Sequence, residues 1–254
     1  VRELLDNYGP VPAHYDHMAE INLDQDLSPV RTPPRLTLDG VRTALRSGVP
    51  VVDLRHRKAF AQRHLEGVTS IEYGAQCATY VGWLLPWGRP LVLVGDDERT
   101  VENAVVDLAR IGIDTVAGVS TESMPERAAE TRTGCGYRQL RWEALAEERR
   151  AGRRPLVIDV RSEAEFAEGH VEGAFNAPVH ELPRLLDTLP AGEAWVHCKS
   201  GYRAGIAASI LHAAGRSVVH VDDDWDRATA AGIATSALSN SEKPLQALLT
   251  NTHI

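Results

Sequence analysis

Short runs of apolar residues alternate along the chain with longer stretches in which apolar residues recur every three or four positions. Runs such as "PLVLV" and "EAWVH" have the length and composition of strands that are buried on both faces. The longer stretches, such as "LDGVRTALRSG" and "WEALAEERRAG", end at a glycine, which is typical of a helix end. The pattern therefore predicts an α/β fold with parallel sheets and helices on both faces of each sheet.

This pattern of predicted strands and helices occurs twice in the sequence. The segment 51–71, "VVDLRHRKAFAQRHLEGVTSI", aligns without a gap on 157–177, "VIDVRSEAEFAEGHVEGAFNA". A later pair, "RPLVLVGDDERTVENAVVDLARIGIDTV" and "GEAWVHCKSGYRAGIAASILHAAGRSVV", continues the match as strand, loop, helix, glycine and strand. Each copy is about 100 residues long, which is enough for a domain. The sequence therefore predicts two similar α/β domains.

We place the domain boundaries where the apolar periodicity stops. Residues 1–35 are rich in proline and are interpreted as an arm or linker. The first domain is predicted over 36–122 and the second over 137–235. The polar segment 123–136 between them has no apolar periodicity and is interpreted as a linker. Residues 236–254 form a C-terminal tail.

Composition and charge narrow the class of protein. The chain is 43% hydrophobic and 24% charged, which is typical of a soluble globular protein. Its net charge of −8 disfavours nucleic acids and anionic membranes as partners, because both attract the opposite sign. No apolar run approaches the roughly 20 residues of a spanning helix, and no secretory segment opens the chain. We expect a cytoplasmic protein.

The three cysteines are odd in number and widely spaced, which suits a reducing compartment better than a disulfide framework. They lack the close pairs of a structural zinc site, so we expect no metal and no other cofactor. Cys77 lies in "YGAQCATY" and Cys135 in the linker, and both are interpreted as incidental. Cys198 differs, because "AWVHCKSGYRAGIAAS" places it between an apolar strand and a helix of small residues.

The surroundings of Cys198 suit a nucleophile, which must act as the thiolate. A loop that opens a helix presents successive backbone N–H groups, and such a nest binds anions. Gly201 can take the positive φ that a tight loop needs. Lys199 and Arg203 add positive charge for a sulfur oxyanion. We predict Cys198 as the catalytic residue and the rest of the loop as the substrate-binding residues: Lys199, Ser200, Gly201, Tyr202 and Arg203.

The second copy resembles the rhodanese family of sulfurtransferases. "VIDVR" followed by "GHVEGAFNAP" looks like the first motif of that family, and "HCKSGYRA" looks like its C-x4-R active-site loop. The first copy has the first motif but offers Gly95 or Asp96 where Cys198 stands, so it cannot form a persulfide. The segment "VVHVDDDWDRATAAG" is similar to the one that closes the domain, with two departures. Asp223 and Asp224 replace a Gly-Gly pair, and Ala228 replaces a tryptophan.

The resemblance implies a double displacement without a cofactor. Cys198 would take sulfur from thiosulfate or a persulfide and pass it to a thiol acceptor or to cyanide. The order of a silent copy before an active copy is similar to bacterial fusions of a metallo-β-lactamase-fold persulfide dioxygenase with two rhodanese domains. Such a likeness implies a metallo-β-lactamase-fold domain N-terminal to this chain.

Two alternatives stay open. In the first, the chain serves such a fusion as a non-catalytic sulfur-carrier or docking module. A phosphatase or arsenate reductase of the same fold is disfavoured, because those enzymes have one more residue in the loop, C-x5-R.

Three polar residues of the second copy resemble acid–base groups but recur in the silent first copy. A residue that both copies keep serves what both need, which is folding, so these three are assigned supporting roles: Asp159, Arg161 and His170, matched by Asp53, Arg55 and His64. His197 directly precedes Cys198. Because adjacent residues of a strand point to opposite faces, we expect His197 in the core or behind the site.

Overall fold

The computed structural model describes residues 15, 17, 30–122, 134–233 and 235–236. These residues belong to two compact units. The first unit contains the chain up to His56 and residues 67–134, and the second contains Arg57–Glu66 and the chain from Cys135 onward. Most of the predicted arm, linker and tail lies outside the described residues.

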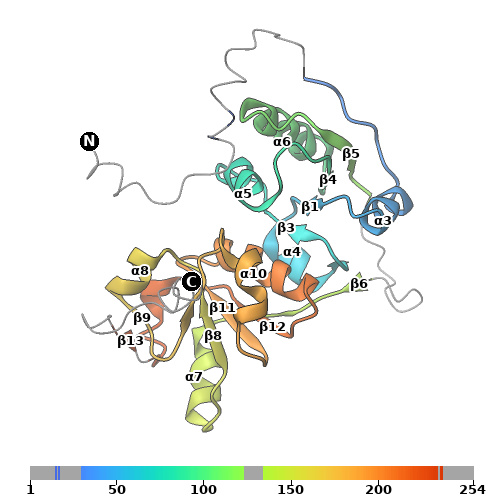
Figure 1. Cartoon of the computed structure of the whole chain (residues 1–254). Helices are drawn as coiled ribbons and strands as arrows, with labels where there is room; N and C mark the ends of the chain where they lie inside the picture. The colour runs from blue at the N-terminus through green and yellow to red at the C-terminus, as the bar shows by residue number, and fades with distance from the viewer. Residues whose placement is uncertain (1–14, 16, 18–29, 123–133, 234, 237–254) are drawn as a thin grey trace, which may run out of the picture. The chain divides into compact units, whose positions relative to one another are not determined.

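The first unit is built on a four-stranded sheet in the order β3-β1-β4-β5, in which every neighbouring pair is parallel. Its strands are β1 (Val51–Asp53), β3 (Thr69–Ser70), β4 (Leu91–Val94) and β5 (Val116–Ser120). Its helices are α3 (Leu38–Arg46), α5 (Cys77–Leu84) and α6 (Glu98–Arg110) (Figure 1). A parallel bridge between Arg35 and Val119 continues the sheet beyond β5.

The second unit is built on a five-stranded parallel sheet in the order β10-β8-β11-β12-β7. The strands of this sheet are β7 (Arg138–Leu140), β8 (Leu156–Asp159), β10 (Phe175–Asn176), β11 (Ala194–His197) and β12 (Val218–Val221). The α-helices are α4 (Arg57–Gln62), α7 (Trp142–Arg150), α8 (Glu163–Glu168), α9 (Leu182–Leu185) and α10 (Tyr202–Ala213). Short pieces complete it: β2 (His64–Leu65), β6 (Gly134–Cys135), β9 (His170–Val171), β13 (Thr235–Ser236), and the 3-10 turns η1 (Leu186–Thr188) and η2 (Trp225–Arg227).

The strand order of the first sheet recurs in the second. β3, β1, β4 and β5 occupy the same order as β10, β8, β11 and β12, as the repeat in the sequence requires. The predicted parallel α/β architecture is confirmed. The predicted strand, loop, helix and strand after each first motif is also confirmed, as β4-α6-β5 and β11-α10-β12.

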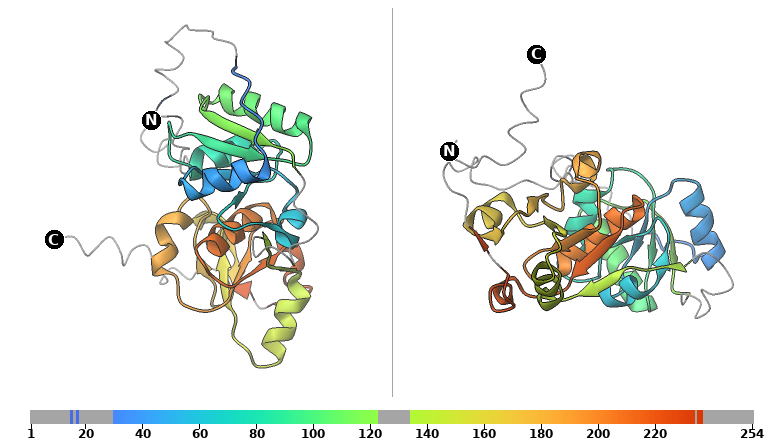
Figure 2. Two further views of the ribbon diagram at one scale, coloured as in Figure 1. Left: turned by 90° about the vertical axis from the view of Figure 1, so that its right-hand side faces the viewer. Right: turned by 90° about the horizontal axis from the view of Figure 1, so that it is seen from below.

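The core of the second unit explains why its central strands are continuous apolar runs. All four residues of β11 and all four of β12 are buried. Helix α10 lies against both strands, and its small residues allow close contact (Figures 1 and 2). A cluster around Trp142, Trp195 and Val219 fills this core. The carboxyl end of β11 is therefore held rigidly where the chain turns into α10.

Within the part of the chain that the structure describes, every helix is too short or too polar to cross a bilayer.

Candidate active site

A short loop joins β11 to α10 (Figure 1), and Cys198 is its first residue, at the carboxyl end of the buried strand. Gly201 is the N-cap residue of α10 and has φ of 87°, so the predicted positive φ is confirmed. A Cβ atom at this position would lie 2.1 Å from Asp222 Oδ1 and 3.2 Å from Asp222 Cα. Both the backbone conformation and the close approach of Asp222 therefore require glycine here.

Three contacts hold the carbonyl groups of the loop. The backbone N–H of Trp225 donates to the carbonyl of Lys199 at 2.7 Å. The carbonyl of Gly201 lies 2.9 Å from His220 Nε2 and also accepts the N–H of Gly205. These contacts fix the path of the backbone between β11 and α10.

The side chains of the loop differ in exposure. Cys198 is 1% exposed, so its thiol lies beneath the loop. Gly201 is also buried, Lys199 and Ser200 are exposed, and Tyr202 is half-buried.

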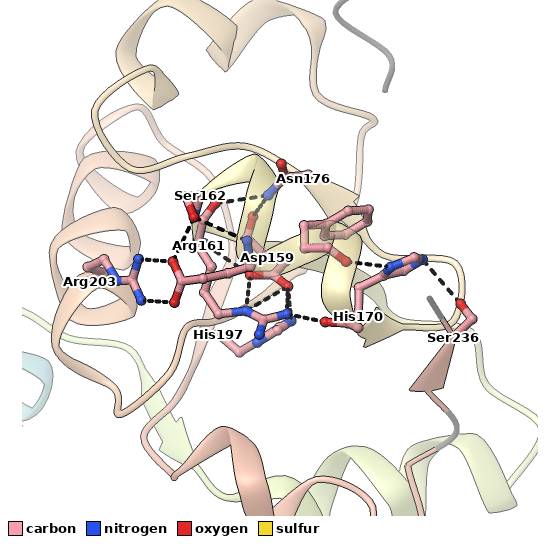
Figure 3. A network of polar contacts seen from close by, with 11 residues as sticks. Asp159, Arg161, Ser162, His170, Asn176, His197, Arg203 and Ser236 are labelled. Carbon is pink, nitrogen blue, oxygen red and sulfur yellow. Dashed lines mark hydrogen bonds and ion pairs between the residues drawn. The ribbon is translucent and has the colours of Figure 1, made fainter. Parts of the chain in front are cut away.

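Arg203 forms a bidentate ion pair with Glu165 of helix α8. Its Nη1 and Nη2 atoms donate to the two carboxylate oxygens at 2.6 and 2.7 Å (Figure 3). Glu165 also accepts from the backbone N–H and the hydroxyl of Ser162, completing a capping box. Burial alone would raise the pKa of Glu165, but the hydrogen bonds from Arg203 and Ser162 outweigh it and lower the pKa to about 2. The predicted substrate-binding role of Arg203 stays a prediction, since Glu165 occupies its guanidinium.

The pair of Asp159 and Arg161 closes the end of β8. Arg161 donates from its backbone N–H at 3.0 Å and from Nη2 at 2.6 Å to the buried carboxylate (Figure 3). Its Nη2 also donates to the carbonyl of Gly169. Asp53 and Arg55 make the same two contacts in the first unit, at 3.0 and 2.7 Å. The same contacts occur in both units, and the supporting role of Asp159 and Arg161 stays a prediction.

His170 likewise has a structural place. Its Nδ1 lies 2.9 Å from the carbonyl oxygen of Phe166, and its ring stacks on that of Phe166 at 3.9 Å between centroids. Its Nε2 faces the hydroxyl of Ser236 at 3.1 Å (Figure 3). His64 repeats the contact with the carbonyl of Phe60 at 2.8 Å, so both copies use this histidine to fix the same turn.

His197 lies in the core, as expected, with no exposed surface. It is stacked against Trp225 at 5.4 Å and meets Trp142 edge-on at 4.9 Å. Neither ring nitrogen has a hydrogen-bond partner in the described part of the chain, and Nε2 lies 3.6 Å from Asp159 Oδ2. Burial lowers the pKa of His197 despite the opposing effect of Asp159, which keeps the ring neutral.

Several residues that position the loop were not singled out from the sequence. Trp225 lies inside "VVHVDDDWDRATAAG" and receives the guanidinium of Arg161 over its ring at 4.0 Å, a cation–π contact. Glu165 and Asp222 act on the loop through Arg203 and Gly201. Ala228, where the family has a tryptophan, is buried in the core. Trp225 supplies an aromatic ring beside the loop in this chain.

The first unit has no thiol at the equivalent point. There the chain leaves β4 through Gly95, and Asp97 caps α6 by accepting the N–H of Thr100. Cys77 is buried in α5, and burial raises the pKa of its thiol to about 12. The interpretation of Cys77 as incidental is consistent with a thiol held in its unreactive form.

A cavity of about 540 Å³ in the second unit lies at the other end of the sheet. Its lining includes Pro155, Leu156 and Glu193, which stand at the amino ends of β8 and β11. Ligands of parallel α/β sheets bind outside the carboxyl ends of the strands, where Cys198 lies. We therefore place the candidate active site at the Cys198 loop.

The second unit thus has a parallel sheet, flanking helices and a cysteine in the loop before the N-terminus of a helix. This combination of fold and site is the basis for comparing it with known proteins. Residues 142–231 match the family model described as Rhodanese-like domain. The uncharacterized protein YqhL of Bacillus subtilis is 33% identical over 87 residues, which are 33% of this chain and 69% of that protein. The chain belongs to the rhodanese family.

Two further similar proteins have named activities. A sulfurtransferase of Allochromatium vinosum is 32% identical over 57 residues, which are 22% of this chain and 53% of that protein. A crystal structure of thiosulfate sulfurtransferase from Pseudomonas aeruginosa has 17% identity and a TM-score of 0.35, covering 80% of this chain and 43% of that one. The chain thus spans about half to two thirds of the length of the curated relatives described here.

Proposed function

We propose that the second unit is a sulfurtransferase that carries sulfane sulfur as a persulfide on Cys198. The observation that supports this most is the position of Cys198, which follows buried β11 and precedes α10. At that position the sulfur lies at the ligand-binding edge of the sheet and at the positive end of a helix. The chain belongs to the rhodanese family, and a protein similar to it is named a sulfurtransferase. Both findings support the same chemistry.

The first half of the reaction loads sulfur onto the protein. The thiolate of Cys198 attacks the outer sulfur of thiosulfate, and a new S–S bond forms as the S–S bond of the donor breaks. Sulfite leaves with the electron pair. A persulfide donor reacts in the same way, with its thiolate as the leaving group. Covalent storage divides one difficult transfer into two easier ones.

The second half of the reaction regenerates the free thiolate of the cysteine. An acceptor thiolate, or cyanide in an assay, attacks the outer sulfur of the persulfide, and the thiolate of Cys198 leaves. Electrons balance within each displacement, so neither half needs an oxidant, a reductant or a metal.

Each loop residue has a role in this proposal. Lys199, which is exposed, attracts the anionic donor. The backbone around Ser200 and Gly201 binds the oxyanion, and Tyr202 borders the bound sulfur. Arg203 fixes the first turn of α10 through its ion pair with Glu165 of α8. Asp159, Arg161 and His170 hold the frame behind the loop.

We further infer that the first unit is a silent copy of the same domain. The shared strand order, the repeated pair of Asp53 and Arg55, and the lack of a thiol after β4 support this inference. On this inference, the first unit has no sulfur-transfer activity of its own.

The phosphatase alternative gains no support from the loop. A phosphate-binding arginine donates both guanidinium arms to the substrate. Arg203 instead donates both arms to Glu165. The loop also has four residues between Cys198 and Arg203, fewer than the C-x5-R loop of that class.

The test is formation of thiocyanate from thiosulfate and cyanide by the whole chain. We expect turnover in the native protein and in Cys77→Ser, and loss to background in Cys198→Ser. Cys77→Ser is the matched control because it also removes a buried thiol.

Turnover that survives in Cys198→Ser would refute the assignment of the nucleophile. If the native chain accepts sulfur from neither thiosulfate nor glutathione persulfide, the sulfurtransferase proposal fails. Hydrolysis of a phosphate ester, or reduction of arsenate, would then favour the phosphatase class.

A further inference from the structure

Two histidines and a cysteine meet within the second unit, away from the Cys198 loop. His64 comes from β2, Cys135 from β6 and His212 from the last turn of α10. Their ligand atoms all lie within 4.8 Å of one another. His64 is buried, and the other two side chains are half-buried. The three residues are far apart in the sequence, so only the fold brings them together.

The orientation of His64 makes it suitable as a metal ligand. Its Nδ1 lies 2.8 Å from the carbonyl oxygen of Phe60, and a carbonyl only accepts, so Nδ1 carries the proton. The lone pair is then on Nε2, which lies 3.1 Å from His212 Nδ1. Metal-binding histidines commonly donate their other N–H to a backbone carbonyl in this way.

The second copy shows which part of this arrangement the fold itself needs. His170 makes the same contact with a phenylalanine carbonyl, but its Nε2 faces the hydroxyl of Ser236. The contact through Nδ1 is thus common to both copies, whereas the imidazole and the thiol beside Nε2 are particular to His64. The thiol of Cys135 also donates to the carbonyl oxygen of His64 at 3.6 Å, which keeps Sγ next to this histidine.

The distances are close to those of a zinc site. Tetrahedral zinc with Zn–N of about 2.0–2.1 Å and Zn–S of about 2.3 Å separates two nitrogens by roughly 3.3 Å and nitrogen from sulfur by roughly 3.6 Å. The two imidazole nitrogens are already 3.1 Å apart. The thiol of Cys135 needs a displacement of at most about 1.2 Å to reach this nitrogen–sulfur separation, since all three atoms lie within 4.8 Å of one another.

The electrostatic surroundings also suit a cation. Burial raises the pKa of the Cys135 thiol, and the nearby Glu66 carboxylate raises it further. Burial lowers the pKa of His212, against the opposing effect of the Glu66 carboxylate. Glu66 therefore adds negative potential to the cluster, and a divalent cation would relieve the repulsion between its carboxylate and a thiolate.

We propose that His64, Cys135 and His212 form a site for a divalent transition metal of the zinc class. On binding, the metal forms a bond to Cys135 Sγ and the thiol proton leaves to solvent. The proton between the two imidazoles moves to His212 Nε2, which frees Nδ1 as a ligand. A fourth position stays open for water.

Such a metal would act as a structural staple inside the second unit. It would tie the segment of β2 and the start of the Cys135 strand to α10, the helix that opens at the candidate active site. A backbone hydrogen bond already joins two of these segments, because the N–H of Tyr137 donates to the carbonyl of Ala61 in α4 at 2.9 Å. The proposal is independent of the sulfur chemistry at Cys198.

The experiment uses the whole chain carrying Cys198→Ser, so that the candidate nucleophile cannot bind metal. Zn²⁺ is added to metal-free protein, and bound metal per chain is measured after dialysis. Co²⁺ is added to a second sample, in which thiolate-to-cobalt charge transfer reports a bond to cysteine. We expect one metal per chain, a charge-transfer band, and a midpoint of thermal unfolding that rises with metal concentration.

Two variants with matched controls locate the site. Cys135→Ala is compared with Cys77→Ala, and His212→Gln with His180→Gln, another half-buried histidine of the second unit. Altering a group that hydrogen-bonds to a metal ligand costs about 10–100-fold in metal affinity. Loss of a ligand itself should therefore cost more than about 100-fold. The controls should bind as the parent does.

Two results would overturn the proposal. One is no bound metal in the folded parent. The other is equal binding by the parent and a folded Cys135→Ala or His212→Gln variant. If one variant does not fold, the other still decides the question, because each removes a ligand from a different element.

Discussion

The ion pair between Glu165 and Arg203 gives the sharpest prediction about stability. In Glu165→Gln the carboxylate that accepts both arms of Arg203 and the N–H of Ser162 becomes a neutral amide. The amide keeps one oxygen as an acceptor but turns an NH₂ group toward a donor. We expect the free energy of unfolding to fall, because a charge-assisted bidentate pair is replaced by one weaker hydrogen bond.

The size of this loss in unfolding free energy follows from the pKa of Glu165. Burial alone would raise it, and the bonds from Arg203 and Ser162 lower it from 4.5 to about 2. A difference of about 2.5 units corresponds to about 3.4 kcal/mol. The side chain is 30% exposed, and solvent screening reduces the effect to about 1–2 kcal/mol.

The same lowering of the Glu165 pKa determines how the stabilisation by this ion pair depends on pH. Because the folded-state pKa is below the unfolded value, the stabilisation is fully present above about 4.5 and is lost as pH falls toward 2. The gap in unfolding free energy between the native chain and Glu165→Gln should therefore be about 1–2 kcal/mol at pH 7 and should shrink near pH 3. Urea-induced unfolding at several pH values measures it.

Glu163→Gln is the control, because it removes the same charge from the first turn of α8 at an exposed position. Its effect should be small at every pH. A gap for Glu165→Gln that is absent at pH 7, or that stays constant down to pH 3, would refute the reasoning about this pair.

Three further predictions concern the frame of the loop. Gly201→Ala should abolish sulfur transfer and lower the thermal midpoint, since its Cβ would meet Asp222 Oδ1 at 2.1 Å with φ of 87°; activity equal to the native chain would contradict this. His197→Phe should keep the fold and lessen the loss of stability below about pH 6.5, because the unfolded histidine takes up a proton there and the buried one does not; a steeper acid loss in urea titrations would count against it. Trp225→Leu should lower the unfolding free energy by about 1–3 kcal/mol through lost packing and the lost cation–π contact with Arg161, and a neutral result would show that the ring is dispensable.

The features that the sequence predicts well are local or repeated. The parallel strands follow from short apolar runs between helices, and Asp159 and Arg161 form their pair across two positions of one turn. The presence of Asp53 and Arg55 in a copy without a thiol separates structural residues from chemical ones before any coordinates are known.

The features that the sequence misses join distant segments. Glu165 meets Arg203 across two helices, and nothing in either helix marks the partner. His64 belongs by sequence to the first repeat but by contacts to the second unit, where it meets His212. Cys135 is a lone cysteine in a polar segment, so its neighbours become visible only in the fold.

The most direct test of the central claim is the intact mass of the protein after exposure to thiosulfate alone, with no acceptor present. We expect the native chain and Cys77→Ser to gain the mass of one sulfur atom and Cys198→Ser to gain none, and we expect cyanide to remove the added mass. A gain of sulfur by Cys198→Ser, or no gain by the native chain from thiosulfate or glutathione persulfide, would contradict it.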